Sequence, residues 1–211
     1  MSRATLAVIA KSPIPGAVKT RLCPPLSPAQ AAALALAALR DTLAAVAETP
    51  VTRRVIVLAG AAGTWLPEGF DVLTQRGETL DERLAAAFED LAGPTLIIGM
   101  DTPQVSGPTL ERALHALRSA PAVLGPAVDG GYWAIGLRHS DPRALLGVPM
   151  SSAHTLTAQR IRLRSLGLSV TELPTLRDVD TFTDALAVAG EAPETRFART
   201  LSSIDPTRVA A

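Results

Sequence analysis

The stretch Ala7-Val8-Ile9-Ala10-Lys11-Ser12-Pro13-Ile14-Pro15-Gly16-Ala17-Val18-Lys19-Thr20-Arg21-Leu22 decides how the chain is organised. It begins as an apolar run typical of a buried β-strand and then becomes a loop with two prolines and three cations, Lys11, Lys19 and Arg21. A helix is predicted to begin soon afterwards, with Ser27 as its cap. A cationic loop at the carboxyl end of a first strand is where an α/β sheet holds an anionic ligand.

Strand and helix patterns alternate along most of the chain. The sequence predicts strands at 5–10, 54–58, 71–74, 95–99, 122–125, 132–137 and 168–173. It predicts helices at 27–47, 79–91, 106–119, 152–166, 181–189 and 194–201. This alternation indicates an α/β fold, with a parallel or mixed sheet and helices on both of its faces. The turn at Asp129-Gly130-Gly131 predicts an antiparallel insertion, and the length indicates one domain over residues 1–211.

Composition excludes several classes of partner. The 20 basic residues balance the 20 acidic ones, so no bulk attraction to nucleic acid or to a membrane is expected. Aromatic residues make up 3% of the chain, too few for a base-stacking surface. The longest apolar run, 31–39, is far below the roughly 20 residues that span a bilayer and predicts a buried helix. A single cysteine, Cys23, fits a reducing cytoplasm.

The first loop is a candidate phosphate-binding site. Lys19 and Arg21 can neutralise phosphate oxygens, and Gly16 lets the backbone approach a ligand closely. The loop lacks the glycine spacing of a P-loop and of a dinucleotide fingerprint. The plain alternative is a solvated surface loop. The residues predicted to bind nucleotide are Lys11, Pro15, Gly16, Lys19, Thr20 and Arg21.

Carboxylates are predicted at the ends of other strands. Asp101 directly follows a short apolar strand and suits a hard cation such as Mg²⁺, which takes one or two protein carboxylates together with substrate phosphates. Asp180, with Asp178 nearby, can supply a second carboxylate. The alternatives are a cap or turn role for Asp101, a helix cap for Asp180 and an ordinary hairpin turn at Asp129.

Four blocks of this sequence together resemble the DUF2064 family of small bacterial proteins, some of them linked to arsenosugar biosynthesis. They are the loop 10–22, Gly77-Glu78-Thr79-Leu80-Asp81-Glu82-Arg83-Leu84, Gly99-Met100-Asp101-Thr102-Pro103 and Gly125-Pro126-Ala127-Val128-Asp129-Gly130-Gly131-Tyr132-Trp133. The later stretch Asp178-Val179-Asp180-Thr181 is similar to the late Asp-x-Asp-Thr of many nucleotidyltransferases. The resemblance implies a three-layer α/β/α nucleotide-diphospho-sugar transferase (GT-A-like) fold with a mostly parallel sheet, shared with guanylyltransferases of molybdenum-cofactor and F420 synthesis. It also implies that Asp101 and Asp180 bind Mg²⁺ or Mn²⁺ and that the first loop holds nucleotide phosphates.

The sequence therefore predicts a metal-dependent transferase acting on a nucleotide or nucleotide-sugar and a small-molecule acceptor, and the family tilts this to glycosyl transfer. Asp101 and Asp129 are its candidate catalytic residues, and the acceptor side is assigned to Gly130, Gly131 and Tyr132. Two alternatives stay open: a nucleotidyltransferase that releases pyrophosphate, and a non-catalytic nucleotide-binding module. A homodimer is compatible with the sequence, which does not give the donor, the acceptor or the pathway.

Overall fold

The computed structural model describes residues 2–204, and its centre is a seven-stranded mixed sheet in the order β3-β2-β1-β4-β6-β5-β7. The strands are β1 (Ser2–Lys11), β2 (Val51–Ala59), β3 (Asp71–Thr74), β4 (Thr95–Gly99), β5 (Ala122–Pro126), β6 (Tyr132–Leu137) and β7 (Val170–Glu172). Neighbouring strands are parallel except at β6, which is antiparallel to both β4 and β5. The predicted α/β class and the antiparallel insertion are confirmed.

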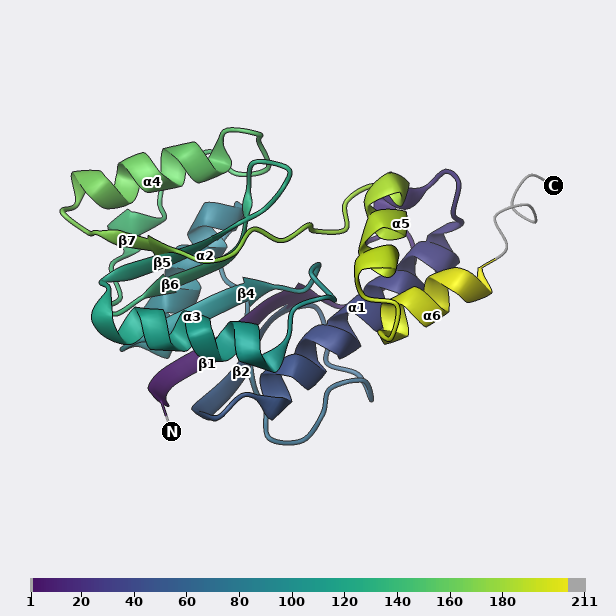
Figure 1. The fold of residues 1–211 in the computed structure, drawn as a ribbon, viewed down its shortest axis with the longest axis horizontal. Helices are drawn as coiled ribbons and strands as arrows, with labels where there is room; N and C mark the ends of the chain where they lie inside the picture. The colour runs from purple at the N-terminus through teal and green to yellow at the C-terminus, as the bar shows by residue number, and fades with distance from the viewer. Residues whose placement is uncertain (1, 205–211) are drawn as a thin grey trace.

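Helices cover both faces of this sheet, which makes three layers (Figure 1). They are α1 (Pro28–Glu48), α2 (Leu80–Leu91), α3 (Gly107–Ser119), α4 (Thr155–Ser165), α5 (Phe182–Glu191) and α6 (Arg196–Ser203), with two 3-10 turns, η1 (Thr20–Leu22) and η2 (Pro142–Ala144). Helices α1 and α3 pack on one face, and α2 and α4 pack on the other. The right-handed crossovers expected between parallel strands lead to this arrangement.

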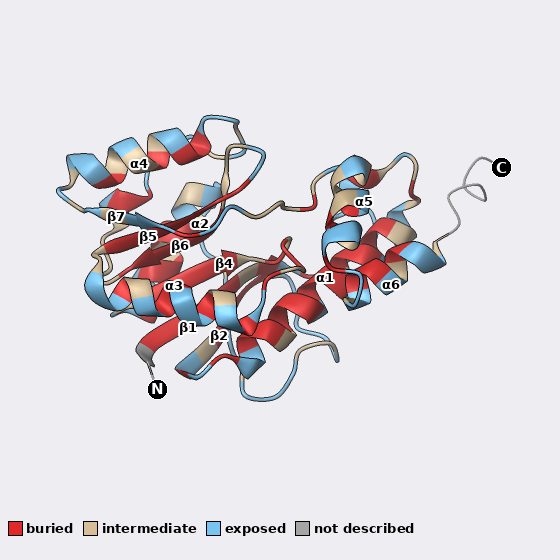
Figure 2. Ribbon diagram, in the orientation of Figure 1, coloured by how far each residue is buried: buried red, intermediate tan, exposed pale blue. Residues whose placement is uncertain are grey.

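Strand β1 shows why both faces are apolar. Its side chains alternate, so Leu6 and Val8 join the core beneath α1 and α3 while Ala7 joins the core beneath α2 and α4. Val8 lies opposite Ile56 of β2 and Ile98 of β4 in the ladder. Figure 2 shows the central strands largely buried, and the edge strand β7 and the outward faces of the helices exposed. A central strand that is buried on both faces reads as a continuous apolar run, which is the pattern that the sequence shows.

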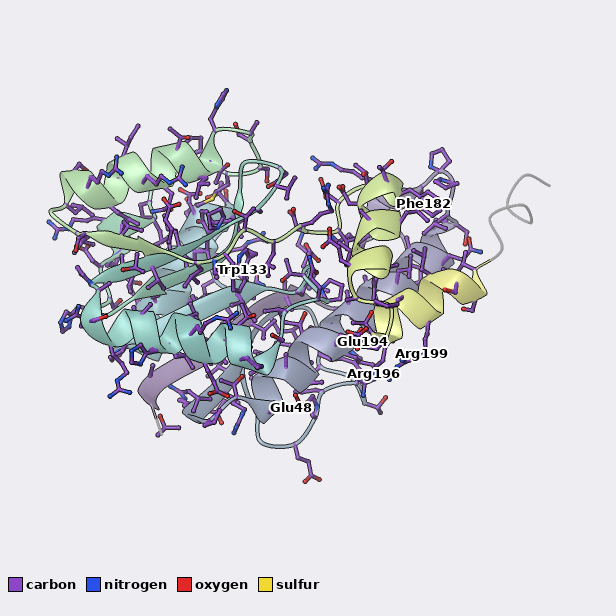
Figure 3. All side chains as sticks on the ribbon, viewed as in Figure 1. Glu48, Trp133, Phe182, Glu194, Arg196 and Arg199 are labelled. Carbon is purple, nitrogen blue, oxygen red and sulfur yellow. The ribbon has the colours of Figure 1, made fainter. Side chains whose placement is uncertain are left out.

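Helices α5 and α6 stand beside the first half of α1 and share a separate apolar cluster with it (Figure 1). Leu22 of η1 is fully buried in this cluster, together with Phe197 of α6. Asp41 of α1 caps α6, because its carboxylate accepts the backbone N–H groups of Arg196 (3.1 Å) and Phe197 (2.8 Å). Arg196 is labelled at this helix start in Figure 3. The loop that carries the predicted cations is therefore anchored to the α5–α6 side of the protein.

Several boundaries follow the local signals. Ser27 and Gln30 cap α1 reciprocally, and Thr79 and Glu82 do the same for α2.

Among the described residues, α1 is long and apolar enough to cross a membrane by length and composition, yet 67% of its apolar window is buried inside the protein. The prediction of a buried helix is confirmed.

Several predicted elements differ in extent, and β1 and β2 each begin three residues before their predicted starts, at Ser2 and Val51. Helix α4 begins at Thr155, three residues after the predicted start, because Ser152 starts a turn: its hydroxyl accepts the His154 N–H (3.2 Å) and its carbonyl accepts the Thr155 N–H (3.0 Å). The Thr155 hydroxyl then donates to the Pro149 carbonyl (2.9 Å) and fixes the preceding loop. Strand β7 is limited to Val170–Glu172 within the predicted 168–173, because only these residues pair with β5.

Candidate functional site

A cavity of about 640 Å³ opens where the carboxyl ends of β1 and β4 meet the β5–β6 turn and the segment after β7. Its floor is apolar and comes from the strands themselves. Its polar lining residues are Lys11, Lys19, Thr20, Arg21, Gln75, Arg83, Asp101, Thr102, Asp129, Tyr132, Ser151, Ser152, Thr155, Asp178 and Asp180. Cavities of this size and position hold small-molecule ligands in open α/β sheets.

The first loop turns its cations into this cavity. Lys19 has a left-handed backbone (φ 49°, ψ 38°), a conformation that costs a non-glycine residue about 1–2 kcal/mol. This conformation begins η1, whose Leu22 is buried while Arg21 stays exposed. Backbone strain of this kind persists where the surrounding packing holds the residue in place, which is often the case at functional sites. The end of the loop that carries Lys19 is thus held in place by Leu22, whereas residues 14–17 are exposed.

Both cations are engaged by acids from distant parts of the chain. The Lys19 ammonium lies 2.8 Å from Oδ2 of Asp101 and also donates to the carbonyl of Val179. Arg21 forms an ion pair with Asp180. The Lys19 side chain is only 12% exposed, so its pair with Asp101 is screened much less than a surface pair.

An extended segment after β7, residues 174–181, carries the late acids; we call it the strap. Figure 1 shows it crossing the end of the sheet to reach α5. It is held by backbone hydrogen bonds, from Leu176 N–H to the Pro126 carbonyl (3.1 Å) and from Val179 N–H to the Asp101 carbonyl (2.9 Å). The indole N–H of Trp133, labelled in Figure 3, donates to the Pro174 carbonyl (3.0 Å).

The strap places Asp178 and Asp180 on either side of Val179, which is buried in the cluster with α5 and α6. Side chains in an extended segment alternate, so the two carboxylates lie opposite to Val179 and both line the cavity. Asp180 faces Arg21, whereas Asp178 lies near Asp129 and Asp101. The sequence analysis assigned the second metal carboxylate to Asp180 and mentioned Asp178 only as its neighbour.

Asp178 is the most perturbed acid of the cavity. Burial raises its pKa to about 6, the negative charge of Asp129 adds to the rise, and Asp101 adds a smaller amount, while Lys19 opposes it. Like charges held close together disfavour ionisation, and such clusters are common at functional sites. The free protein therefore keeps a carboxylate cluster that a positively charged ligand would stabilise.

The Asp129 turn depends on its glycines. Oδ1 of Asp129 accepts the Gly131 N–H at 2.7 Å, which fixes the carboxylate. Gly130 has φ 88°, and a Cβ there would lie 2.2 Å from the Ala153 carbonyl oxygen. The Gly130 carbonyl also accepts the Leu156 N–H at 2.8 Å. Gly130 therefore joins this turn to the start of α4 and is itself a packing requirement.

Most predicted site residues line the cavity together, but three do not: Pro15, Gly16 and Gly130 are outside its lining. Pro15 and Gly16 lie in the exposed part of the first loop. Tyr132 lines the cavity, and burial raises the pKa of its hydroxyl, which contacts Gln159 Oε1 at 3.3 Å.

Seven polar lining residues were not predicted as site residues: Gln75, Arg83, Thr102, Ser151, Ser152, Thr155 and Asp178. Arg83 is held by the carbonyls of Gly77 (3.1 Å) and Glu78 (2.9 Å). The Gln75 amide donates to the carbonyls of Ala10 (2.7 Å) and Val57 (2.9 Å), at the ends of β1 and β2. The block 77–84 contained the signal for Arg83, whereas Gln75 had none.

The carboxylates of the cavity fit a metal ion that takes most of its ligands from water and from the substrate. Within residues 2–204, no three His, Cys, Asp or Glu side chains converge closely enough to hold a metal by themselves. Mg²⁺ usually takes one or two carboxylates and completes its shell with waters and substrate phosphates. Asp101 and Asp178 can supply these carboxylates beside the cations of the first loop.

Similar proteins were found by fold and by family. A protein from Desulfovibrio desulfuricans G20, provisionally named a nucleotide-diphospho-sugar transferase, is 27% identical with a TM-score of 0.86, over 96% of this chain and 95% of that one. Rv0371c of Mycobacterium tuberculosis H37Rv, crystallised with manganese, is 20% identical with a TM-score of 0.57, over 89% and 97%. The 2-C-methyl-D-erythritol 4-phosphate cytidylyltransferase of Thermus thermophilus is 17% identical with a TM-score of 0.56, over 92% and 100%. The last two share the fold alone.

None of the curated protein sequences compared with this chain matches it. The family model described as "Uncharacterized protein conserved in bacteria (DUF2064)" matches residues 35–152, more than half of the chain. This range contains three of the blocks on which the resemblance rests, and the fold agrees with the one that the resemblance implies. The chain therefore belongs to the DUF2064 family.

Proposed function

We propose that the protein is a metal-dependent transferase that uses a nucleotide-sugar donor. The observation that carries this proposal is the convergence of cations from the first loop and carboxylates from three distant segments on one cavity at the carboxyl ends of the strands. The relative from Desulfovibrio desulfuricans, whose provisional name is of this class, supports it. We place the protein in the cytoplasm, as its single cysteine suggests.

Lys19 and Arg21 are proposed to hold the phosphates of the donor, with Lys11 at the rim of the same cavity. Their charges would face the diphosphate as it leaves and takes up negative charge. The left-handed backbone of Lys19 already places its ammonium beside the cavity, where it would exchange Asp101 for a phosphate oxygen. Preorganised charge of this kind is a large contribution to catalysis of phosphate departure.

Asp101 and Asp178 are proposed to hold Mg²⁺ or Mn²⁺. Asp180 is the second ligand that the sequence predicts, and, like Asp101, it is paired with a cation of the first loop. We give the second ligand role to Asp178, because burial and the charge of Asp129 disfavour its ionised form and a bound cation would relieve this, and we assign Asp180 to orienting Arg21. When bound, the metal would supply positive charge to the leaving diphosphate.

Asp129 is proposed to act on the acceptor. One carboxylate oxygen is fixed by the Gly131 N–H, which leaves the second oxygen to accept a proton from an acceptor hydroxyl. Gly131 and Tyr132 would form the wall of this side of the cavity, and Gly130 would keep the turn in place. The acceptor is a small molecule, since the whole cavity is about 640 Å³.

The second candidate is a nucleotidyltransferase, which would release pyrophosphate instead of a nucleoside diphosphate. The structural likeness to a cytidylyltransferase favours considering it. The two chemistries share the phosphate and metal roles above. They differ in the bond that breaks, which is the carbon–oxygen bond between sugar and diphosphate in glycosyl transfer and a phosphorus–oxygen bond between two phosphates in nucleotidyl transfer. Mass spectrometry of the leaving group after incubation with nucleoside triphosphates or nucleotide-sugars separates them.

The function is tested by titrating a panel of nucleotides and nucleotide-sugars with Mn²⁺ and following the thermal unfolding temperature. We expect at least one nucleotide to raise it in wild type and to raise it less in Lys19→Met, which lacks a proposed phosphate contact. Arg76→Met is the matched control, because Arg76 pairs with Asp90 away from the cavity. No rise with any of these ligands would contradict the proposal, and binding without turnover would indicate a non-catalytic module.

A further inference from the structure

Two cations of the first loop, Lys19 and Arg21, are paired with carboxylates of the cavity in the free protein. The Lys19 ammonium has two partners, Oδ2 of Asp101 at 2.8 Å and the carbonyl of Val179. Arg21 is paired with Asp180. Lys19 and Arg21 must therefore each give up a carboxylate partner to bind a phosphate.

This cross-pairing has a consequence for an anionic ligand that arrives without a metal. A diphosphate that takes Lys19 from Asp101 leaves that carboxylate without its cation, in a cavity where Asp129 and Asp178 are also negative. The pair is partly buried, with Lys19 12% and Asp101 37% exposed, so water and salt screen the exposed charge incompletely. The free diphosphate would gain one contact and create a repulsion.

A diphosphate that carries a divalent cation meets a different balance. Lys19 exchanges Asp101 for a phosphate oxygen while Asp101 exchanges Lys19 for the cation, so each charge keeps an opposite partner. We propose that the ligand of this cavity is the metal-chelated diphosphate group as one unit, and that the Lys19–Asp101 pair rejects the metal-free form. The inference rests on the proposed function and specifies the form of its ligand.

The pairing also explains why both ligands are coupled. Coupling between two ligands is reciprocal, so a metal that strengthens diphosphate binding is itself bound more tightly when diphosphate is present. In this cavity the coupling comes from the Lys19–Asp101 salt bridge, which either ligand alone would have to break. A diphosphate alone would leave Asp101 without its cation, and a metal alone would leave Lys19 without its carboxylate. Removing Asp101 should therefore remove the coupling and free Lys19.

The test measures binding of inorganic pyrophosphate by isothermal titration calorimetry, in EDTA and in Mg²⁺. Wild type is expected to bind at least about tenfold more tightly with Mg²⁺. Asp101→Asn is expected to bind pyrophosphate about tenfold more tightly than wild type in EDTA and to lose most of the Mg²⁺ effect. Asp129→Asn removes the same charge from the same cavity but releases no cation, so its gain in EDTA should be under about threefold.

Asp180→Asn is a second variant, in case Asp101→Asn does not fold. It frees Arg21 and should also improve binding in EDTA, by less, because this pair is more exposed. Equal gains in Asp101→Asn and Asp129→Asn would overturn the proposal, because bulk charge would then explain them. Wild-type binding that is equal in EDTA and Mg²⁺ would overturn it while leaving nucleotide binding intact. No binding of pyrophosphate or of any nucleotide in either buffer would overturn both this inference and the proposed function.

Discussion

Asp178→Asn should make the metal-free protein more stable at neutral pH. Burial and the charge of Asp129 raise the pKa of Asp178 from its ordinary value of 3.8 to about 6. One pKa unit is worth about 1.4 kcal/mol, so the ionised carboxylate costs at most about 3 kcal/mol. Asp178 is partly exposed, and solvent screening reduces this to about 1–2 kcal/mol.

The sign and the pH window follow from linkage. Between pH 3.8 and about 6 the folded protein binds more protons at Asp178 than the unfolded chain does, so stability falls as pH rises through this window. Below pH 3.8 the wild type and the variant carry the same charge here and should be equally stable. Above about pH 7 the variant should be more stable by the full amount, which corresponds to about 3–6 °C in the unfolding temperature.

The assay is urea unfolding of both proteins in EDTA at about pH 4 and about pH 7.5, followed by circular dichroism. Adding Mg²⁺ with pyrophosphate should then stabilise wild type more than Asp178→Asn, because the variant lacks a proposed ligand. An Asp178→Asn protein that is less stable than wild type at the higher pH in EDTA would refute the reasoning, because it would mean that the carboxylate makes net favourable contacts in the free protein.

Three further substitutions follow from the same structure. Gly130→Ala should cost at least about 3 kcal/mol of unfolding free energy in urea melts, because its Cβ would meet a backbone carbonyl, whereas Gly69→Ala, also at positive φ but with open space, should cost about 1–2 kcal/mol. Asp41→Ala should cost about 2–3 kcal/mol in the same melts, since it removes the acceptor of two backbone N–H groups at the start of α6. Lys19→Met should weaken binding of Mg²⁺-pyrophosphate at least about tenfold by calorimetry, through the loss of a charge-assisted hydrogen bond.

Each of these has an outcome that contradicts it. Equal costs for the two glycine variants would mean that the start of α4 can move away from the β5–β6 turn without penalty. An Asp41→Ala protein as stable as wild type would mean that the contact of Asp41 with the start of α6 contributes little to the unfolding free energy. Unchanged binding in Lys19→Met would remove Lys19 from the phosphate site.

The parts of the fold that the sequence predicts well are those fixed by neighbours in the chain. The reciprocal caps of α1 and α2 join residues three apart, and both helices begin where these signals place them. Strands β4 and β6 match their predicted ranges because each is a short apolar run between turn residues. The start of α4 was missed, because Gly130 and Ala153 set it through a contact between distant segments.

The same limit applies to the candidate site. The sequence identifies Asp101 and Lys19, since each follows a strand directly or lies in a loop of unusual composition. It assigns the second metal carboxylate to Asp180, because the pairing of Asp180 with Arg21, 159 positions away, leaves no local signal that would favour Asp178. It gives no signal for Gln75, which is fixed only by the carbonyls at the ends of two neighbouring strands. Residues whose role is set by tertiary partners are the ones that a pattern cannot find.

The position of Lys19 explains why α5 and α6 matter to a site at the end of the sheet. Leu22 anchors the first loop in the apolar cluster of α1, α5 and α6, whereas Asp101 is fixed by β4. The Lys19 ammonium joins the two, because it contacts both Asp101 and the Val179 carbonyl of the strap. A ligand that replaces these contacts would have to span the same distance between the first loop and Asp101. The position of the first loop in the site therefore depends on the packing of α5 and α6 against α1. Asp41 lies far from the cavity, but it caps α6 and so contributes to the geometry of the site through this packing.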